Sequence, residues 1–196
     1  PILDLNGNIR HYLSIRHEIT DRKLAEFELE KKADLQRLLV EISSKYINIP
    51  LPEVDKNINE SLERIGNFVN VDRVYVFEYN FEKKTASNLY EWCALGIESQ
   101  IESLQNIPFS EIPVWVETHS KGDSIVVPNV KELPQSKFRE LIEVQDIQSL
   151  IALPMMDGIN CTGFVGFDSV KGLRVFSNEE KNLLELYTQM LVNISR

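Results

Sequence analysis

The most constraining feature of the chain is an Asp-Gly pair, Asp157-Gly158, between two apolar segments in QSLIALPMMDGINCTGFVGFDS, residues 148–169. An Asp-Gly pair accepts the positive φ angles of a two-residue hairpin turn, so the segments beside it are predicted to be antiparallel strands. Residues 150–156 are apolar on both faces, which favours a strand in the middle of a covered sheet. Pro154 cannot donate a ladder hydrogen bond, and we expect it at a bulge or where the strand leaves its partner.

A helix is predicted directly after this hairpin. Ser177 and Glu180 have the spacing of a capping box, in which each side chain bonds the other residue's backbone amide. Apolar residues then recur at helical spacing: Leu183, Tyr187, Met190 or Leu191, and Ile194. In the second strand, Gly163 and Gly166 indicate close packing or a close backbone approach. The core module therefore ends strand, turn, strand, loop, helix.

A long helix rich in Glu, Lys and Leu is predicted over residues 20–49, with Thr20 as its N-cap. Lys31 interrupts its apolar face, which gives a weak coiled-coil pattern at first and a stronger one from Leu35. Such a helix either docks on its own domain or connects two copies as a dimer-forming segment, and its length favours the second interpretation. Pro50 and Pro52 end it.

The remaining elements alternate between helices and paired strands. Helices are predicted around residues 58–69, over 110–120 with Pro113 in the first turn, and over 134–144 with Pro134 in the first turn. Strands are predicted over 73–79, 86–94 and 124–127, and residues 95–107 as a loop with a short helix. Upstream, Asn6-Gly7 predicts a hairpin with strands near 1–5 and 9–17. The order favours an α+β fold in which helices sandwich an antiparallel sheet.

Composition and motifs exclude several functions. A net charge of -9 argues against a nucleic-acid partner, and no run approaches 18 apolar residues, so we expect neither membrane contact nor a membrane span. Cys93 and Cys161 are predicted to pack as small hydrophobic residues, which fits a reducing, cytoplasmic compartment. The three His lack ligand spacing and no catalytic motif is present, so we predict no metal site and no catalysis. Because the chain begins at Pro1, we expect it to be a piece of a longer protein.

Five motifs resemble those of GAF domains, the small-molecule sensing modules of signalling proteins: DRVYVFEYN at 72–80, YEWC at 90–93, SLIALPM at 149–155, GFVGFDSV at 163–170 and VFSNEEKNLL at 175–184. NGNIRHYLSIRHEITDRKLAE at residues 6–26 also resembles the end of a PAS domain and its exit into a signalling helix. The resemblance implies PAS strands at 1–19, a connector helix at 20–49 and a GAF domain at 50–196. His17-Glu18 superficially resembles a kinase phosphoacceptor, but we place it at the PAS exit.

This arrangement implies a regulatory module of a bacterial sensor, in the first instance a histidine kinase of a two-component system. The alternatives are the input domain of a diguanylate cyclase, or a ligand-free structural connector. Specialised GAF domains that hold a bilin on Cys, bind cyclic nucleotides or reduce methionine sulfoxide carry signatures that this chain does not reproduce. We therefore name no cofactor and expect at most an unidentified small molecule.

Four aromatic residues are the candidates for the wall of a small-molecule pocket: Tyr90 and Trp92 on one strand face, and Trp115 and Phe138 on covering helices. The alternative is that they are ordinary core residues. Strict alternation places Asn88 and Glu91 on opposite faces of that strand, so only one of them is expected at the pocket. A homodimer through the two terminal helices, 20–49 and 178–195, would pass a ligand-dependent change to an output domain.

Overall fold

The computed structural model describes residues 2–3, 5–11, 20–46 and 50–194. It divides into two compact units, Pro1–Asp34 and Leu35–Arg196, with the boundary inside helix α1 (Thr20–Tyr46). The predicted long helix is confirmed as far as Tyr46. Residues 47–49 lie outside the described residues.

The first unit contains a small hairpin and the beginning of α1. Strands β1 (Ile2–Leu3) and β2 (Ile9–His11) pair antiparallel, which confirms the hairpin predicted at Asn6-Gly7. Gly7 has φ +82, a backbone conformation that favours glycine in such turns. The rest of the predicted second strand and His17-Glu18 lie outside the described residues, so the PAS interpretation stays a prediction. Residues 20–33 of α1 are exposed, including Leu24, Phe27 and Leu29.

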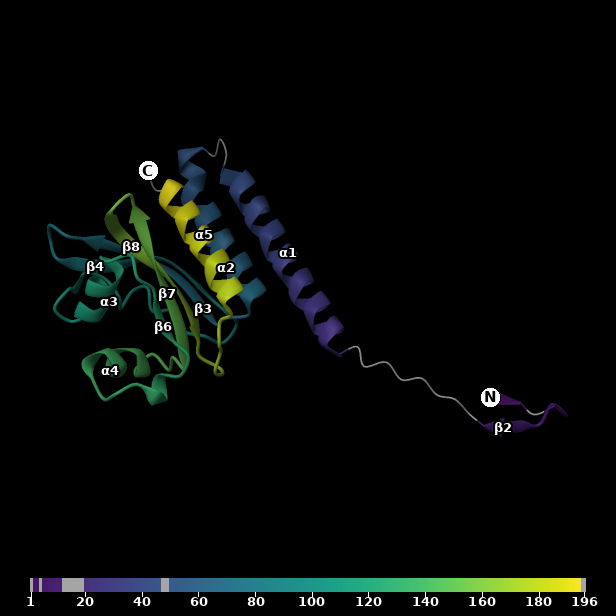
Figure 1. Ribbon diagram of the computed structural model, residues 1–196. Coiled ribbons are helices and arrows are strands. Elements are labelled where there is room, and N and C mark those ends of the chain that lie inside the picture. The colour runs from purple at the N-terminus through teal and green to yellow at the C-terminus, as the bar shows by residue number, and fades with distance from the viewer. Residues whose placement is uncertain (1, 4, 12–19, 47–49, 195–196) are drawn as a thin grey trace. The chain divides into compact units, whose positions relative to one another are not determined.

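The second unit is built on a six-stranded antiparallel sheet of order β5-β4-β3-β8-β7-β6, which confirms the predicted fold class (Figure 1). Its strands are β3 (Arg73–Asn80), β4 (Thr85–Cys93), β5 (Ile107–Pro108), β6 (Ile125–Val127), β7 (Ser149–Asp157) and β8 (Asn160–Ser169). The β7–β8 hairpin that the sequence predicted lies inside the sheet, as expected. Because β6 pairs only with residues 150–152 of β7, Pro154 lies beyond the end of that ladder.

One face of the sheet, called here the helix face, is covered by α2 (Val54–Val69) and α5 (Asn178–Ile194), and residues 35–46 of α1 pack on these two helices (Figure 1). The apolar stripe of α2 buries Ile58, Leu62 and Ile65 against the sheet, because residues three and four apart share one side of a helix. The predicted capping box begins α5: Glu180 N donates to Ser177 Oγ at 3.1 Å, and Ser177 N donates to the Glu180 carboxylate at 3.0 Å.

The opposite face, called here the pocket face, is covered by α3 (Pro113–His119), α4 (Lys137–Glu143), a short 3-10 turn (Val130–Glu132) and the loop between β4 and α3. Pro113 is the first residue of α3, as predicted. Its counterpart Pro134 is not in α4, because Ser136 caps that helix by accepting a hydrogen bond from Arg139 N. The short helix expected within residues 95–107 does not form, and β5 begins at Ile107, the last residue of that range.

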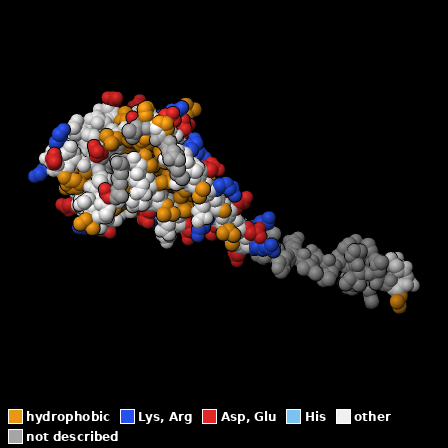
Figure 2. All heavy atoms as spheres, turned by 90° about the horizontal axis from the view of Figure 1, so that it is seen from above, with side chains coloured by type: hydrophobic (Ala, Val, Ile, Leu, Met, Phe, Trp, Pro, Cys, Tyr) orange, Lys and Arg blue, Asp and Glu red, His pale blue; other side chains and the backbone are white. Residues whose placement is uncertain are grey.

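Local details of turns and surface complete the fold. The β7–β8 turn is one residue later than predicted, with Gly158 at φ +64 as its first central residue. Both cysteines are free thiols, with Cys161 buried. Among the described helices none is long and apolar enough to cross a membrane. On the face of the second unit seen in Figure 2, Lys and Arg are interspersed with Asp and Glu instead of forming one basic patch.

Candidate ligand pocket

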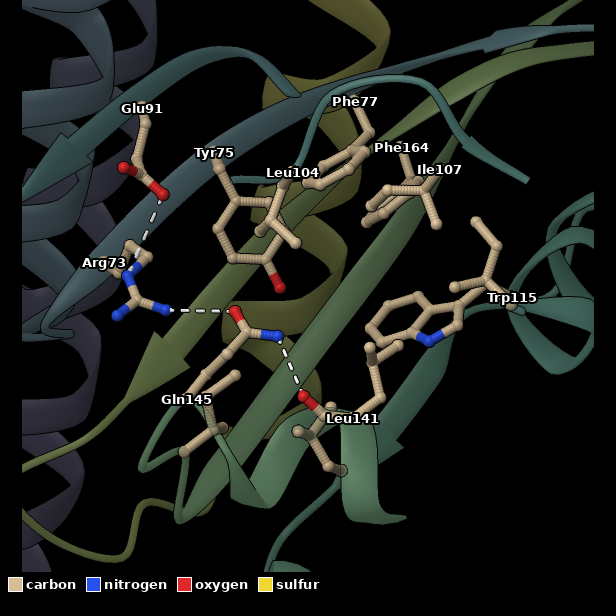
Figure 3. Close-up of a pocket in the computed structure, with 13 residues that line it drawn as sticks. Arg73, Tyr75, Phe77, Glu91, Leu104, Ile107, Trp115, Leu141, Gln145 and Phe164 are labelled. Carbon is tan, nitrogen blue, oxygen red and sulfur yellow. Dashed lines mark hydrogen bonds and ion pairs between the residues drawn. The ribbon is translucent and has the colours of Figure 1, made fainter. Parts of the chain in front are cut away.

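A cavity lies on the pocket face, between the sheet and the segments that cover it (Figure 3). The volume that water molecules can occupy in it is about 40 Å³. Its polar end is formed by Arg73, Tyr75, Glu91 and Gln145, and its other end by aromatic residues. Aliphatic residues of the covering segments complete the lining: Leu104, Ile107, Ile112, Leu141, Ile142 and Ile147. A volume of this size holds a few water molecules.

Arg73, the first residue of β3, places a buried guanidinium group at the polar end of the cavity. The residue is 2% exposed. Its Nη1 donates to Gln145 Oε1 at 3.5 Å and its Nη2 to the Glu98 carbonyl at 3.3 Å, both long for a charged donor. Its Nε has no hydrogen-bond partner. The guanidinium group is therefore buried with its donors only partly satisfied.

Asp168 lies beside Arg73 because β3 and β8 pair in that register. Its Oδ2 is 3.6 Å from Arg73 Nη1, and its Oδ1 accepts a hydrogen bond from Tyr75 Oη at 2.9 Å. Tyr75 reaches it across Gly166, where any Cβ would overlap the tyrosine ring. Burial raises the pKa of Asp168 to about 7, although Arg73 and the hydrogen bond from Tyr75 oppose this shift. Burial also raises the pKa of Tyr75, so its phenol remains a donor.

Glu91 organises the loop that follows β4. One of its oxygens accepts hydrogen bonds from Ser99 Oγ and from the backbone amides of Gln100 and Ile101. The other accepts from Asn88 Nδ2 at 3.3 Å and lies 3.9 Å from Arg73 Nε. The Glu91 side chain is 1% exposed, and its oxygens are thus occupied by the protein itself.

A β-bulge in β4 explains why Asn88 and Glu91 meet, although strict alternation predicted opposite faces. Phe77 pairs with Asn88 and Val76 with Tyr90, so Leu89 is an extra residue in the ladder. Beyond the bulge the alternation is shifted by one, and Glu91 turns towards the pocket face. The prediction that these two residues lie on opposite faces was therefore wrong, although only Glu91 of the two lines the cavity.

Two of the four predicted pocket residues lie on the pocket face and two on the helix face, because the bulge sets the direction of Tyr90 and Trp92. Trp115 lines the cavity. The Phe138 ring contacts the Trp115 ring, and the two ring centroids are 5.6 Å apart. Tyr90 and Trp92 share a face, as predicted, but it is the helix face, where Trp92 lies against Gly66 of α2. The Tyr90 hydroxyl donates to Asp55 of α2 at 2.6 Å. These two residues therefore do not line this cavity.

An aromatic cluster forms the apolar end of the cavity. The Phe164 ring is stacked on Phe77 at 4.8 Å and on Trp115 at 5.1 Å between ring centroids. Figure 3 shows these rings on the side away from Arg73. Trp115 is 5% exposed and its indole Nε1 has no hydrogen-bond partner. The lining thus combines an apolar body with unsatisfied donors, as small-molecule sites do.

Residues 134–147, which include α4, cover the cavity as a lid. Among the described residues, the bond from Arg73 to Gln145 is the hydrogen bond that joins this segment to the sheet. Gln145 Nε2 donates to the Leu141 carbonyl at 3.0 Å, so its side chain folds back on helix α4, which ends two residues before it (Figure 3). The rest of the contact is apolar, through side chains such as buried Ile142. An outward movement of this lid would enlarge the cavity.

Sequence reasoning missed the polar residues of this site. Arg73, Asp168 and Gln145 were not among the candidates. A signal for the first two was present, because a charged residue inside or beside an otherwise apolar strand is rarely buried without a partner. Nothing comparable marks Gln145, since its position depends on how α4 packs.

The comparisons with known proteins agree with this architecture. The model of the GAF domain family matches residues 53–193. The chain therefore belongs to the GAF family, which confirms that part of the predicted resemblance.

A curated relative extends the match upstream of this domain. The methanogenesis regulatory histidine kinase FilI of Methanothrix harundinacea (strain 6Ac) is 31% identical over 191 residues, covering 95% of this chain and 21% of the relative. The chain thus spans about a fifth of the length of the relative it matches.

Two solved structures illustrate the shared fold. The phycocyanobilin-bound GAF domain of a cyanobacterial phytochrome has a TM-score of 0.68 and 14% identity, over 81% of this chain and 92% of that chain. The GAF domain of a phosphoenolpyruvate-protein phosphotransferase from Coxiella burnetii has a TM-score of 0.67 and 14% identity, over 84% and 94%. At these identities the likeness concerns the fold alone.

Proposed function

We propose that this GAF domain is the sensory input of a cytoplasmic signalling protein, that a small molecule occupies the pocket, and that the output is a histidine kinase. The observation that carries the proposal is the cavity itself. It places a buried, incompletely bonded guanidinium opposite an aromatic cluster, under a lid joined to the sheet by one long hydrogen bond. The similarity to a histidine kinase supports the choice of output.

The relay that we propose runs through the sheet. Strands β3 and β8 contribute side chains to both faces: Tyr75 and Phe164 to the pocket face, and Val74 and Phe167 to the core under α5. A ligand that shifts these strands would change how α5 and α1 pack. The proposal needs no catalytic residue in this chain.

A second copy of the chain is the proposed partner. A groove between α1 and α5 is lined by residues that include Leu39, Val40, Leu186 and Met190, and Val40 and Leu186 are 68% and 61% exposed. Paired helices of two copies would cover this groove and connect the two relays, as a population shift between two packings requires.

The alternative function is a ligand-free dimerisation connector, and the small size of the cavity favours it. Native mass spectrometry of the purified chain, followed by analysis of the compounds released on denaturation, separates the two. A stoichiometric small molecule on a dimer is the expected result. A ligand-free dimer would favour the connector, and a ligand-free monomer at high concentration would refute the relay.

A further inference from the structure

The unsatisfied atoms of the pocket lining define the chemistry that a ligand must bring. Two lining residues carry a buried polar atom without a hydrogen bond: Arg73 at Nε and Trp115 at Nε1. Both atoms are donors, on residues 2% and 5% exposed. Figure 3 shows the two residues at opposite ends of the cavity. A ligand that satisfies this lining must therefore supply acceptors, which disfavours a cation that has only donors.

The charges around Arg73 disfavour an anion as well. Asp168 Oδ2 lies 3.6 Å from Arg73 Nη1, and Glu91 Oε1 lies 3.9 Å from Arg73 Nε. With both carboxyl groups ionised, the three side chains already sum to one negative charge. A third carboxylate at this buried position would be repelled by the other two, and the low polarity of the surroundings strengthens that repulsion.

The protein itself places an uncharged acceptor at this position. Gln145 Oε1, the oxygen of a neutral carboxamide, accepts the hydrogen bond from Arg73 Nη1 at 3.5 Å. A length of 3.5 Å marks a weak hydrogen bond, so a better placed acceptor can replace it. Phe164 and Trp115 lie beyond it and offer stacked rings to an apolar body.

We propose that the pocket takes an uncharged compound with a carbonyl acceptor on an aromatic or branched aliphatic body, whose carbonyl displaces the Gln145 amide from Arg73. This inference rests on the proposed function, because it names the chemical class of ligand for the same pocket. Displacement of Gln145 also removes the hydrogen bond that ties the lid to the sheet, so binding and lid movement are one event.

The test compares three probes of nearly the same shape, benzamide, benzoate and benzamidine, with toluene as the probe that lacks a polar group. Binding is followed at pH 8.5 by the indole ¹⁵N–H signals of the two tryptophans. Trp115 lines the cavity and Trp92 packs on the opposite face, so Trp92 serves as the internal control. Trp92→Phe assigns the signals.

We expect benzamide to shift the Trp115 signal with a Kd at least tenfold lower than that of benzoate, benzamidine or toluene. Gln145→Ala should lower the Kd of benzamide several-fold, because Arg73 then lacks its internal acceptor. Gln189→Ala, at an exposed position of α5, is the matched control and should leave it unchanged. The comparison of the four probes on the natural sequence tests the proposal even if a variant folds poorly.

The outcomes separate this inference from the proposed function. Benzoate or benzamidine binding as tightly as benzamide would overturn the ligand class while leaving a ligand pocket in place. Toluene binding as tightly as benzamide would show that the carbonyl is not recognised. Failure of all four probes to move the Trp115 signal, in the natural chain and in Gln145→Ala, would overturn the pocket as a small-molecule site and both proposals with it.

Discussion

The two faces of the sheet differ in which polar groups they bury and in how completely those groups are hydrogen-bonded. On the helix face the buried polar groups are mostly hydroxyls, and they are paired: Ser61 Oγ lies 2.7 Å from Tyr187 Oη and accepts a hydrogen bond from Tyr46 Oη at 3.0 Å. On the pocket face an arginine and two carboxyl groups are buried, and two of their polar atoms, Arg73 Nε and Asp168 Oδ2, lack a hydrogen-bond partner. Because unpaired buried groups cost stability, we expect the helix face to contribute more to stability than the pocket face, where the proposed ligand site lies.

The largest loss of stability expected from a single substitution is on the helix face. Leu62→Ala removes a side chain of 0% exposure between α2 and the sheet, and we expect it to lower the free energy of unfolding by about 3 kcal/mol. Urea unfolding followed by circular dichroism measures the loss. Leu95→Ala, at a position that is 97% exposed, is the control and should cost much less. Equal losses at the two positions would contradict the assignment of the core to this face.

A smaller loss of stability is expected at Gly166, where the Tyr75 ring packs directly on the backbone of β8. Gly166→Ala places a methyl group in the ring of Tyr75 and should destabilise the chain by about 2 kcal/mol through overpacking. Gly172→Ala is a matched control, because nothing lies within 4 Å of its added methyl group. Thermal unfolding compares the two variants. If Gly166→Ala were as stable as Gly172→Ala, Tyr75 would not lie across β8.

Asp168 gives the pocket face a dependence of stability on pH between about 4 and 7. Its folded pKa of about 7 lies above the ordinary aspartate value of 3.8, so between these two pH values the native state holds a proton that the unfolded state has lost. Its contribution to stability is therefore complete below about pH 4 and is lost as the pH rises to 7, with a slope of at most roughly 1.4 kcal/mol per pH unit. Arg73, Tyr75 and Glu91 are the charged or titratable groups that act on it.

Asp168→Asn removes this proton linkage. The free energy of unfolding of the variant, relative to that of the natural chain, should rise steadily between pH 4 and 7. Above pH 7 the difference between the two should stay constant. Urea unfolding at pH intervals across this range measures it. A difference that does not change with pH would show that Asp168 is ionised throughout.

The smallest expected effect concerns the hydroxyl network of the helix face. Ser61→Ala takes away the partner that Tyr187 Oη has at 2.7 Å and should lower stability by about 1 kcal/mol. In the double variant with Tyr187→Phe the two losses should be less than additive, because each single change breaks the same bond. Strict additivity, measured by urea unfolding, would mean that the bond contributes nothing.

The sequence predicted the fold well because its signals are local. The capping box at Ser177 and Glu180 and the hairpin at Gly158 both depend on residues within a few positions of one another. The site was predicted poorly because it is assembled across the chain. Arg73 and Asp168 meet only through the register of β3 with β8. Trp115 was among the predicted candidates because a large aromatic residue on a helix that covers a sheet is expected to pack against that sheet.

Leu89 has a consequence for how chains of this kind are compared. This one extra residue sets the phase of the second half of β4, so the identity of a pocket residue there depends on a count of positions as well as on residue type. Deletion of Leu89 would make Tyr90 follow Asn88 directly and so keep Tyr90, Glu91 and Trp92 on their present faces. A strand that kept Leu89 but lost the bulge would instead turn Tyr90 and Trp92 towards the cavity and withdraw Glu91 from its loop. Two GAF domains with the same residues in this strand but different phase would present different chemistry to a ligand.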